Sequence, residues 1–141
     1  MRHQHDNDHL AMLAEFMTAM EQPVSQGWED LEGIRLGLKL ITEEARELEE
    51  AALALSWNSE PNTREDLTKE LADLVYVCWW LAARIGIDLN ATLRLVHASN
   101  MSKLGPDGKP VKRGDGKVLK GPNYRAPDLS DIVRHAPVTL A

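Results

Sequence analysis

Two long stretches of the sequence repeat an apolar residue every three or four positions, which is the period of an amphipathic helix. The first runs from Trp28 to Leu55 and the second from Thr63 to Ile85. The polar break between them contains Pro61 and favours an antiparallel helical hairpin. The predicted apolar stripes are Leu31, Ile34, Leu38, Ile41, Ala45, Leu48, Ala52 and Leu55 on the first helix, and Leu67, Leu71, Leu74, Cys78, Leu81 and Ile85 on the second.

Shorter elements flank this predicted hairpin. We expect an N-terminal helix over residues 8–21, a helix capped by Asp88, a small hairpin over residues 112–119 and a last helix over residues 127–135. Asn62 and Glu65 suggest a capping box, and Gly86 a C-terminal stop. The fold class is therefore all-α, a four- to five-helix bundle. We expect one domain over residues 1–141, with a flexible N-terminus at 1–7 and a loop-like segment at 104–127.

Composition excludes several classes of protein. The chain has 141 residues, 43% of them hydrophobic, and a formal net charge of −6, which does not favour bulk binding of nucleic acid. No apolar run approaches the roughly 20 residues that span a bilayer, so no membrane association is expected. The single cysteine, Cys78, lies in an apolar run and suits a reducing compartment. We therefore expect a cytoplasmic protein.

Two acidic pairs lie beside the predicted stripes. Glu44 and Glu47 are three residues apart on the first long helix, and Glu70 and Asp73 repeat that spacing on the second. Residues three apart share a helix face, so packing of the two helices would bring the four carboxylates together at the edge of the core. Glu43, next to the first pair, is either a group that orients or deprotonates water or an ordinary surface acid.

Four converging carboxylates repel one another unless their pKa values rise or cations bind them. Hard oxygen ligands select Mg²⁺, Mn²⁺ or Ca²⁺, and Mg²⁺ commonly bridges carboxylates to substrate phosphates. The sequence therefore predicts a metal site suited to phosphoanhydride chemistry. The alternative is a pair of amphipathic helices with solvated acids.

Polar residues outside the hairpin leave further alternatives open. His97, Asn100 and Lys103 recur every three residues, followed by a basic segment, and Lys103 is suited either to phosphate or to a frayed helix end. Tyr76, three residues past Asp73, is a candidate for contact with a nucleobase, whereas Trp79 and Trp80 are expected in the core or at a subunit interface.

Three blocks, EEARE (43–47), ELAD (70–73) and HASNMSK (97–103), together resemble the all-α nucleoside triphosphate pyrophosphohydrolases, the MazG-like superfamily. This superfamily includes dimeric dUTPases and phosphoribosyl-ATP pyrophosphohydrolases. The resemblance extends through a glycine- and lysine-rich tail to PNYRAPDL (122–129) and is closest to the single-domain dUTPase-like and phage MazG-like branch.

The resemblance implies a set of roles. Hydrolysis would occur between the α- and β-phosphates of a (d)NTP, with dUTP, dGTP or GTP as candidates, giving a nucleoside monophosphate and pyrophosphate. A homodimer or a dimer of dimers is implied. Two or more Mg²⁺ or Mn²⁺ ions would bind Glu44, Glu47, Glu70 and Asp73, with Glu43 positioning or activating water. Contacts to the substrate would come from Asn100, Lys103, Lys120, Tyr124 and Arg125.

Three other functions are weighed against this one. A phosphoribosyl-ATP pyrophosphohydrolase would use the same carboxylates on another substrate. A non-catalytic helical adaptor would tolerate loss of Glu70 or Asp73, and the presence of all four acids argues against it. A nucleic-acid binder would use the basic tail, but the acidity of the chain argues against that function.

Overall fold

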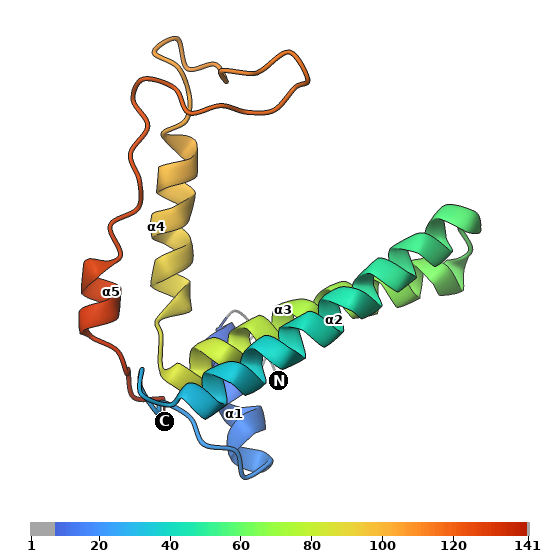
Figure 1. The fold of residues 1–141 in the computed structure, drawn as a ribbon, viewed down its shortest axis with the longest axis vertical. Coiled ribbons are helices and arrows are strands. Elements are labelled where there is room, and N and C mark those ends of the chain that lie inside the picture. Colours follow the sequence, from blue (N-terminus) through green and yellow to red (C-terminus); the bar gives the residue numbers. More distant parts are fainter. Residues whose placement is uncertain (1–7, 141) are drawn as a thin grey trace, which may run out of the picture. The chain divides into compact units, whose positions relative to one another are not determined.

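The computed structural model describes residues 8–140, and within them it contains five helices and no strand, which confirms the all-α prediction (Figure 1). The predicted flexible N-terminus, residues 1–7, lies outside the described residues. None of the described helices is long and apolar enough to cross a membrane. The helices are α1 (His9–Ala19), α2 (Leu31–Trp57), α3 (Pro61–Ile85), α4 (Leu89–Met101) and α5 (Ser130–Arg134).

The described chain divides into two compact units. The first comprises residues 8–87 together with 136–140, and the second comprises residues 88–135. The first unit therefore holds α1, α2 and α3, and the second holds α4, the glycine- and lysine-rich segment and α5. The predicted metal ligands all belong to the first unit, whereas most of the predicted substrate contacts belong to the second.

Helices α2 and α3 run side by side as an antiparallel hairpin, as predicted (Figure 1). The predicted stripe on α2 is wrong in part, because Leu31 and Leu38 are 56% and 54% exposed while Gly33, Gly37 and Ala51 are buried. A Cβ at Gly37 would lie 2.7 Å from Cδ1 of Leu81, so small residues let the two helices approach closely. We call the face of α2 that carries these small residues its seam. The residues of this face recur every three or four positions, with Gly33, Gly37 and Ala51 buried and Leu40, Glu44 and Glu47 partly buried.

Helix ends follow side-chain caps. Asp8, Asp30 and Asp88 each accept a hydrogen bond from a backbone N–H in the first turn of their helix, and Gly86 ends α3 in the left-handed region at φ +92°. Two predicted helix starts lie later in the chain than expected. Helix α2 begins at Leu31, after its cap, and not at Trp28. Helix α5 begins at Ser130, and Pro127 precedes it.

The predicted capping box at the start of α3 is also wrong in its residues. Helix α3 begins at Pro61, whose fixed φ suits the first position of a helix. The Thr63 hydroxyl accepts a hydrogen bond from the backbone N–H of Glu60 at 2.9 Å. Asn62 and Glu65 lie inside the helix rather than at its cap.

The core of the first unit lies where α1 packs on the C-terminal half of α3. Trp79 and Trp80 are 5% and 3% exposed, which places them in the core, one of the two locations predicted for them. The indole N–H of Trp80 donates to Oε1 of Gln22 at 2.9 Å, so its polar atom is satisfied. The buried apolar residues here are Leu10, Leu13, Ala14, Met17, Trp79, Trp80, Ala82, Ala83 and Ile85.

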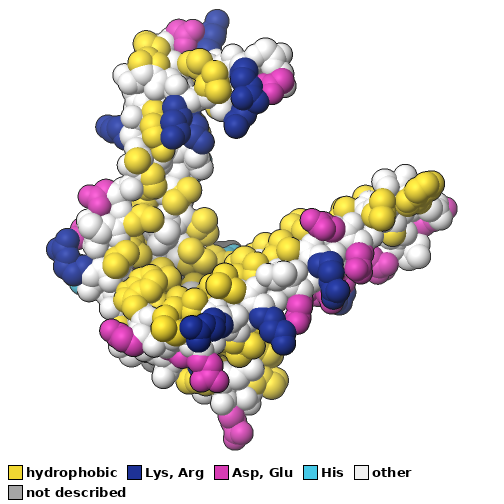
Figure 2. All heavy atoms as spheres, in the orientation of Figure 1, with side chains coloured by type: hydrophobic (Ala, Val, Ile, Leu, Met, Phe, Trp, Pro, Cys, Tyr) yellow, Lys and Arg dark blue, Asp and Glu magenta, His cyan; other side chains and the backbone are white. Residues whose placement is uncertain are grey.

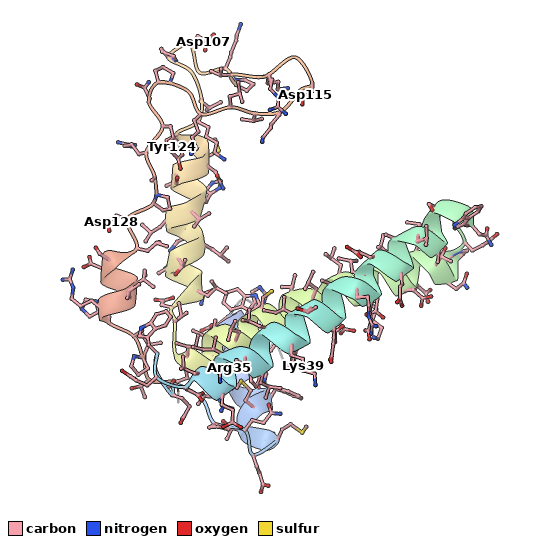
Figure 3. All side chains as sticks on the ribbon, in the orientation of Figure 1. Arg35, Lys39, Asp107, Asp115, Tyr124 and Asp128 are labelled. Carbon is pink, nitrogen blue, oxygen red and sulfur yellow. The ribbon has the colours of Figure 1, made fainter. Side chains whose placement is uncertain are left out.

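In the second unit, two antiparallel bridges follow α4, between Leu104 and Pro110 and between Lys112 and Val118. The second bridge corresponds to the hairpin predicted over residues 112–119. Asp107 and Asp115 lie in the two turns (Figure 3), and each carboxylate accepts a backbone N–H two residues further on. The chain then returns along α4, where Ser99 Oγ donates to the backbone carbonyl of Arg125 at 2.7 Å.

Candidate functional site

Three glutamates meet in the seam of the α2–α3 hairpin. Glu44 and Glu47 occupy consecutive seam positions of α2, and Glu70 faces them from α3. One carboxylate oxygen from each of these residues lies within 4.8 Å of the other two. All three side chains are partly buried, which agrees with the prediction that the carboxylates converge at the edge of the core. Acidic side chains also continue along the exposed surface of this hairpin (Figure 2).

Buried oxygens without partners mark this cluster. Among the described residues, Oε2 of Glu44 and Oε2 of Glu70 are the buried side-chain atoms that have no hydrogen-bond partner. A buried polar atom without a partner costs roughly 1–3 kcal/mol, and more when the group is charged. The pKa of Glu44 is raised above its usual value, first by desolvation and then by the charges of Glu47, Asp73 and Glu70. Without a bound cation, the cluster therefore lowers the stability of the fold, and a positive charge between the carboxylates would offset this cost.

Asp73 lies close enough to raise the pKa of Glu44, but it is not part of the three-carboxylate group. Its Oδ2 accepts a hydrogen bond from Nζ of Lys69 at 2.7 Å, and the same ammonium lies 3.5 Å from Oε1 of Glu70. Lys69 thus supplies positive charge at the outer side of the cluster. Lys69 was not among the predicted site residues, although a lysine four residues before an aspartate on one helix is a recognisable ion-pair spacing.

The donor set of the cluster fits a hard divalent cation. Carboxylate oxygens are the ligands that Mg²⁺, Mn²⁺ and Ca²⁺ prefer, and the unpaired oxygens of Glu44 and Glu70 have acceptor capacity that no described group uses. Glu44, Glu47 and Glu70 could hold one ion directly. Asp73 could join them if its bond to Lys69 were exchanged for one to a cation.

The other predicted residues of the first unit are not drawn into the cluster. Glu43 is exposed on α2. Tyr76 packs its ring edge-on against Phe16 of α1, with ring centroids 5.5 Å apart, and desolvation followed by the charge of Glu15 raises its pKa. A water-activating role for Glu43 and a base contact for Tyr76 remain predictions.

The predicted substrate contacts of the second unit gather near the C-terminal end of α4. Asn100 is exposed and Lys103 is partly buried. Nζ of Lys120 lies 4.7 Å from the centroid of the Tyr124 ring, and Tyr124 projects from the segment beside α4 (Figure 3). Arg125 follows directly, with its backbone bonded to Ser99 and Ser102. Their contact with a substrate remains a prediction.

Residues 13–100 match the model of the phosphoribosyl-ATP pyrophosphohydrolase family, which covers more than half of the chain and both acidic pairs. The chain belongs to this family. Membership places it within the all-α, MazG-like superfamily and indicates a pyrophosphohydrolase that acts on a phosphoanhydride bond. No curated protein matches the chain.

The match to the phosphoribosyl-ATP pyrophosphohydrolase family covers a different range of residues from the motifs that carried the resemblance. The match begins in α1, earlier than the motifs that carried the resemblance, and ends at Asn100. Lys103, Lys120, Tyr124 and Arg125 lie beyond it. The match therefore covers the four acidic residues of the hairpin, whereas the basic segment after α4 lies outside it.

Proposed function

We propose that this chain is a metal-dependent nucleoside triphosphate pyrophosphohydrolase, which cleaves the α–β phosphoanhydride bond of a (d)NTP to give a (d)NMP and pyrophosphate. The observation that carries the proposal is the cluster of Glu44, Glu47 and Glu70, two of which have buried oxygens without partners, in a chain of this family. Candidate substrates are dUTP, dGTP and GTP, and the cofactor is Mg²⁺ or Mn²⁺ with two or more ions.

The site residues would have different roles in this reaction. Glu44, Glu47 and Glu70 would hold the cations, and Asp73 would join them if its bond to Lys69 were exchanged for one to a cation. Bound divalent cations polarise phosphoryl oxygens, lower the pKa of a water molecule and stabilise the leaving pyrophosphate. Glu43 positions or deprotonates the attacking water. Lys69, once released from Asp73, offers its ammonium to the anionic substrate.

A second candidate substrate is phosphoribosyl-ATP, because the matching family is defined by that substrate. The same carboxylates would act on its triphosphate. The two candidates differ in what binds beyond the phosphates, so the chemistry of the cluster is common to both and the rest of the binding site decides between them.

A homodimer, or a dimer of dimers, is part of the proposal. Large apolar side chains stay exposed on the first unit, which supports a partner subunit covering them. Sedimentation equilibrium should give a mass of at least twice the 15.8 kDa of the chain, and the mass of a single chain would contradict this part of the proposal. The exposed apolar residues that a partner subunit would cover are Leu31, Leu36, Leu38, Leu53, Trp57, Leu71 and Val75.

The experiment that tests the proposed reaction resolves its products. The full chain is incubated with the NTPs, the dNTPs and phosphoribosyl-ATP in Mg²⁺ or Mn²⁺, and the products are separated by ion-exchange chromatography. We expect a monophosphate and pyrophosphate from at least one substrate, and no reaction in EDTA. A diphosphate with orthophosphate would contradict the assigned bond, and turnover of phosphoribosyl-ATP alone would select the second candidate.

A further inference from the structure

Lys69 of α3 is the residue whose positive charge pairs with the acids of the hairpin within residues 8–140. Its Nζ lies 2.7 Å from Oδ2 of Asp73 and 3.5 Å from Oε1 of Glu70. The ion pair with Asp73 spans four residues of one helix, so both side chains extend over the same face. The ammonium therefore occupies carboxylate oxygens that a metal ion would also use.

The two carboxylate oxygens of Glu70 have different surroundings. Oε1 lies beside the ammonium of Lys69, whereas Oε2 is buried and has no hydrogen-bond partner. Oε2 of Glu44 is buried and without a partner in the same way. One ammonium therefore satisfies only part of the cluster. A cation that binds Glu70 and Asp73 together has to share these residues with Lys69 or displace it.

The ion pair between Lys69 and Asp73 is easily exchanged. The side chain of Lys69 is 68% exposed and that of Asp73 is 38% exposed. Ion pairs as exposed as this one are weak, because water solvates both charges and a long side chain must be held in one geometry. A divalent cation carries twice the charge of an ammonium and bonds directly to carboxylate oxygens. Such a cation can therefore displace Lys69 from Asp73.

We propose that Lys69 is a positioning residue that competes with the metal ion for Asp73: it holds Asp73 in an ion pair while the site is empty and releases it when a divalent cation binds. The inference rests on the metal site of the proposed function, but not on the bond that is cleaved or on the nucleotide. In this role Lys69 lowers the affinity for the cation and limits the repulsion among the acids of the empty site. The effect of Lys69 on metal binding therefore requires Asp73.

The test is a double-mutant cycle on Mn²⁺ binding in the absence of nucleotide. The full wild-type chain, Lys69→Met, Asp73→Asn and the double variant are titrated with Mn²⁺ in about 0.15 M KCl, and the free ion is measured by electron paramagnetic resonance. We expect Lys69→Met to bind Mn²⁺ about threefold to fivefold more tightly than the wild type, the scale of a favourable exposed ion pair. In the Asp73→Asn background, the same change should alter the affinity less than about twofold, because only the longer contact of Lys69 with Glu70 remains.

Two further variants separate the ion pair from its charge alone. Lys69→Arg keeps a positive charge four residues before Asp73, so its Mn²⁺ affinity should stay within about twofold of the wild type. The matched control is Arg46→Met, which removes a positive charge from an exposed residue of α2 next to Glu47. Arg46 makes no ion pair within residues 8–140, so this substitution should change the affinity less than about twofold.

Thermal denaturation gives a second readout that needs neither nucleotide nor turnover. In EDTA, Lys69→Met should melt at a lower temperature than the wild type, because the acids lose the cation that pairs with them. In saturating Mn²⁺ the difference should shrink or change sign, because the variant binds the ion more tightly and bound ion stabilises the folded chain. A deficit that Mn²⁺ leaves unchanged would show a purely structural role for Lys69 and overturn the inference.

The outcomes separate this inference from the proposed function. Equal tightening by Lys69→Met with and without Asp73 would reduce Lys69 to a long-range charge, and unchanged or weaker binding would exclude competition. Either result would overturn the inference and leave the metal site standing. Mn²⁺ binding by Lys69→Met but not by the wild type would support the inference. Failure of every variant and of the wild type to bind Mn²⁺ would contradict both the inference and the metal site on which the proposed function depends.

Discussion

Replacing Glu44 by glutamine is expected to reduce Mg²⁺-dependent hydrolysis on the order of 10³-fold. The substitution keeps the size of the side chain but removes the charge of a residue that shares the cluster with Glu47 and Glu70. A bound metal supplies several kcal/mol of transition-state stabilisation, and each step of about 1.4 kcal/mol is a factor of ten in rate. Steady-state rates of pyrophosphate release, measured at saturating Mg²⁺, test this expectation.

The same substitution should stabilise the metal-free protein at neutral pH, because desolvation and neighbouring acids raise the pKa of Glu44 above 4.5 in the folded state. In the wild-type chain, the folded state binds more protons than the unfolded state between 4.5 and that raised pKa, so its stability rises as the pH falls through this window. The advantage of Glu44→Gln over the wild type should therefore be largest at neutral pH and disappear below about 4.5. Thermal denaturation in EDTA across this pH range measures the difference.

The matched control is Glu50→Gln, which removes an exposed acid from the same helix. It should leave hydrolysis and the pH dependence of stability close to those of the wild type. If Glu44→Gln and Glu50→Gln behaved alike in both measurements, Glu44 would be an ordinary surface acid.

Replacing Gly37 by leucine is expected to lower the free energy of unfolding by about 1–2 kcal/mol. Overpacking a helix contact costs about 1–3 kcal/mol, and the better helix propensity of leucine returns about 1 kcal/mol at most. The clash is with Leu81, whose Cδ1 and Cβ would lie 2.7 Å and 3.2 Å from the new Cβ. Urea denaturation measures the change, and hydrolysis should fall as well, because displacement of α2 separates Glu44 from Glu70.

Ala54→Leu is the control for Gly37→Leu, because it enlarges an exposed position of the same helix. It should change the free energy of unfolding by less than about 0.5 kcal/mol, as surface substitutions usually do. Equal stability of the two variants would show that Gly37 does not lie in a close helix contact.

The helical period predicted the α2–α3 hairpin but misplaced its contact face on α2. The prediction followed the largest apolar residues and therefore included Leu31 and Leu38, which are exposed. The helices instead meet through Gly33 and Gly37, since small residues permit close approach. A period alone cannot distinguish a stripe that faces the partner helix from one that remains on the outer surface of the hairpin.

The convergence of Glu44, Glu47 and Glu70 could be predicted from spacing, because the acids recur at the same interval on two helices that pack together. The engagement of Asp73 by Lys69 could not be settled in that way, since a lysine at that spacing can equally extend into solvent. The return of residues 121–125 along α4 was also beyond prediction. It depends on hydrogen bonds from Ser99 to a residue far along the chain, for which no local pattern exists.

Binding of Mn²⁺ in the absence of nucleotide tests whether the glutamates of the hairpin form a metal site. The full chain, Glu44→Gln and Glu70→Gln are titrated with Mn²⁺, and the free ion is measured by electron paramagnetic resonance. We expect the wild-type chain to bind Mn²⁺ and each substitution to weaken binding about tenfold or more, because the charge of the ligand set governs affinity. Equal Mn²⁺ affinity in all three proteins would contradict a metal site in the seam of the hairpin.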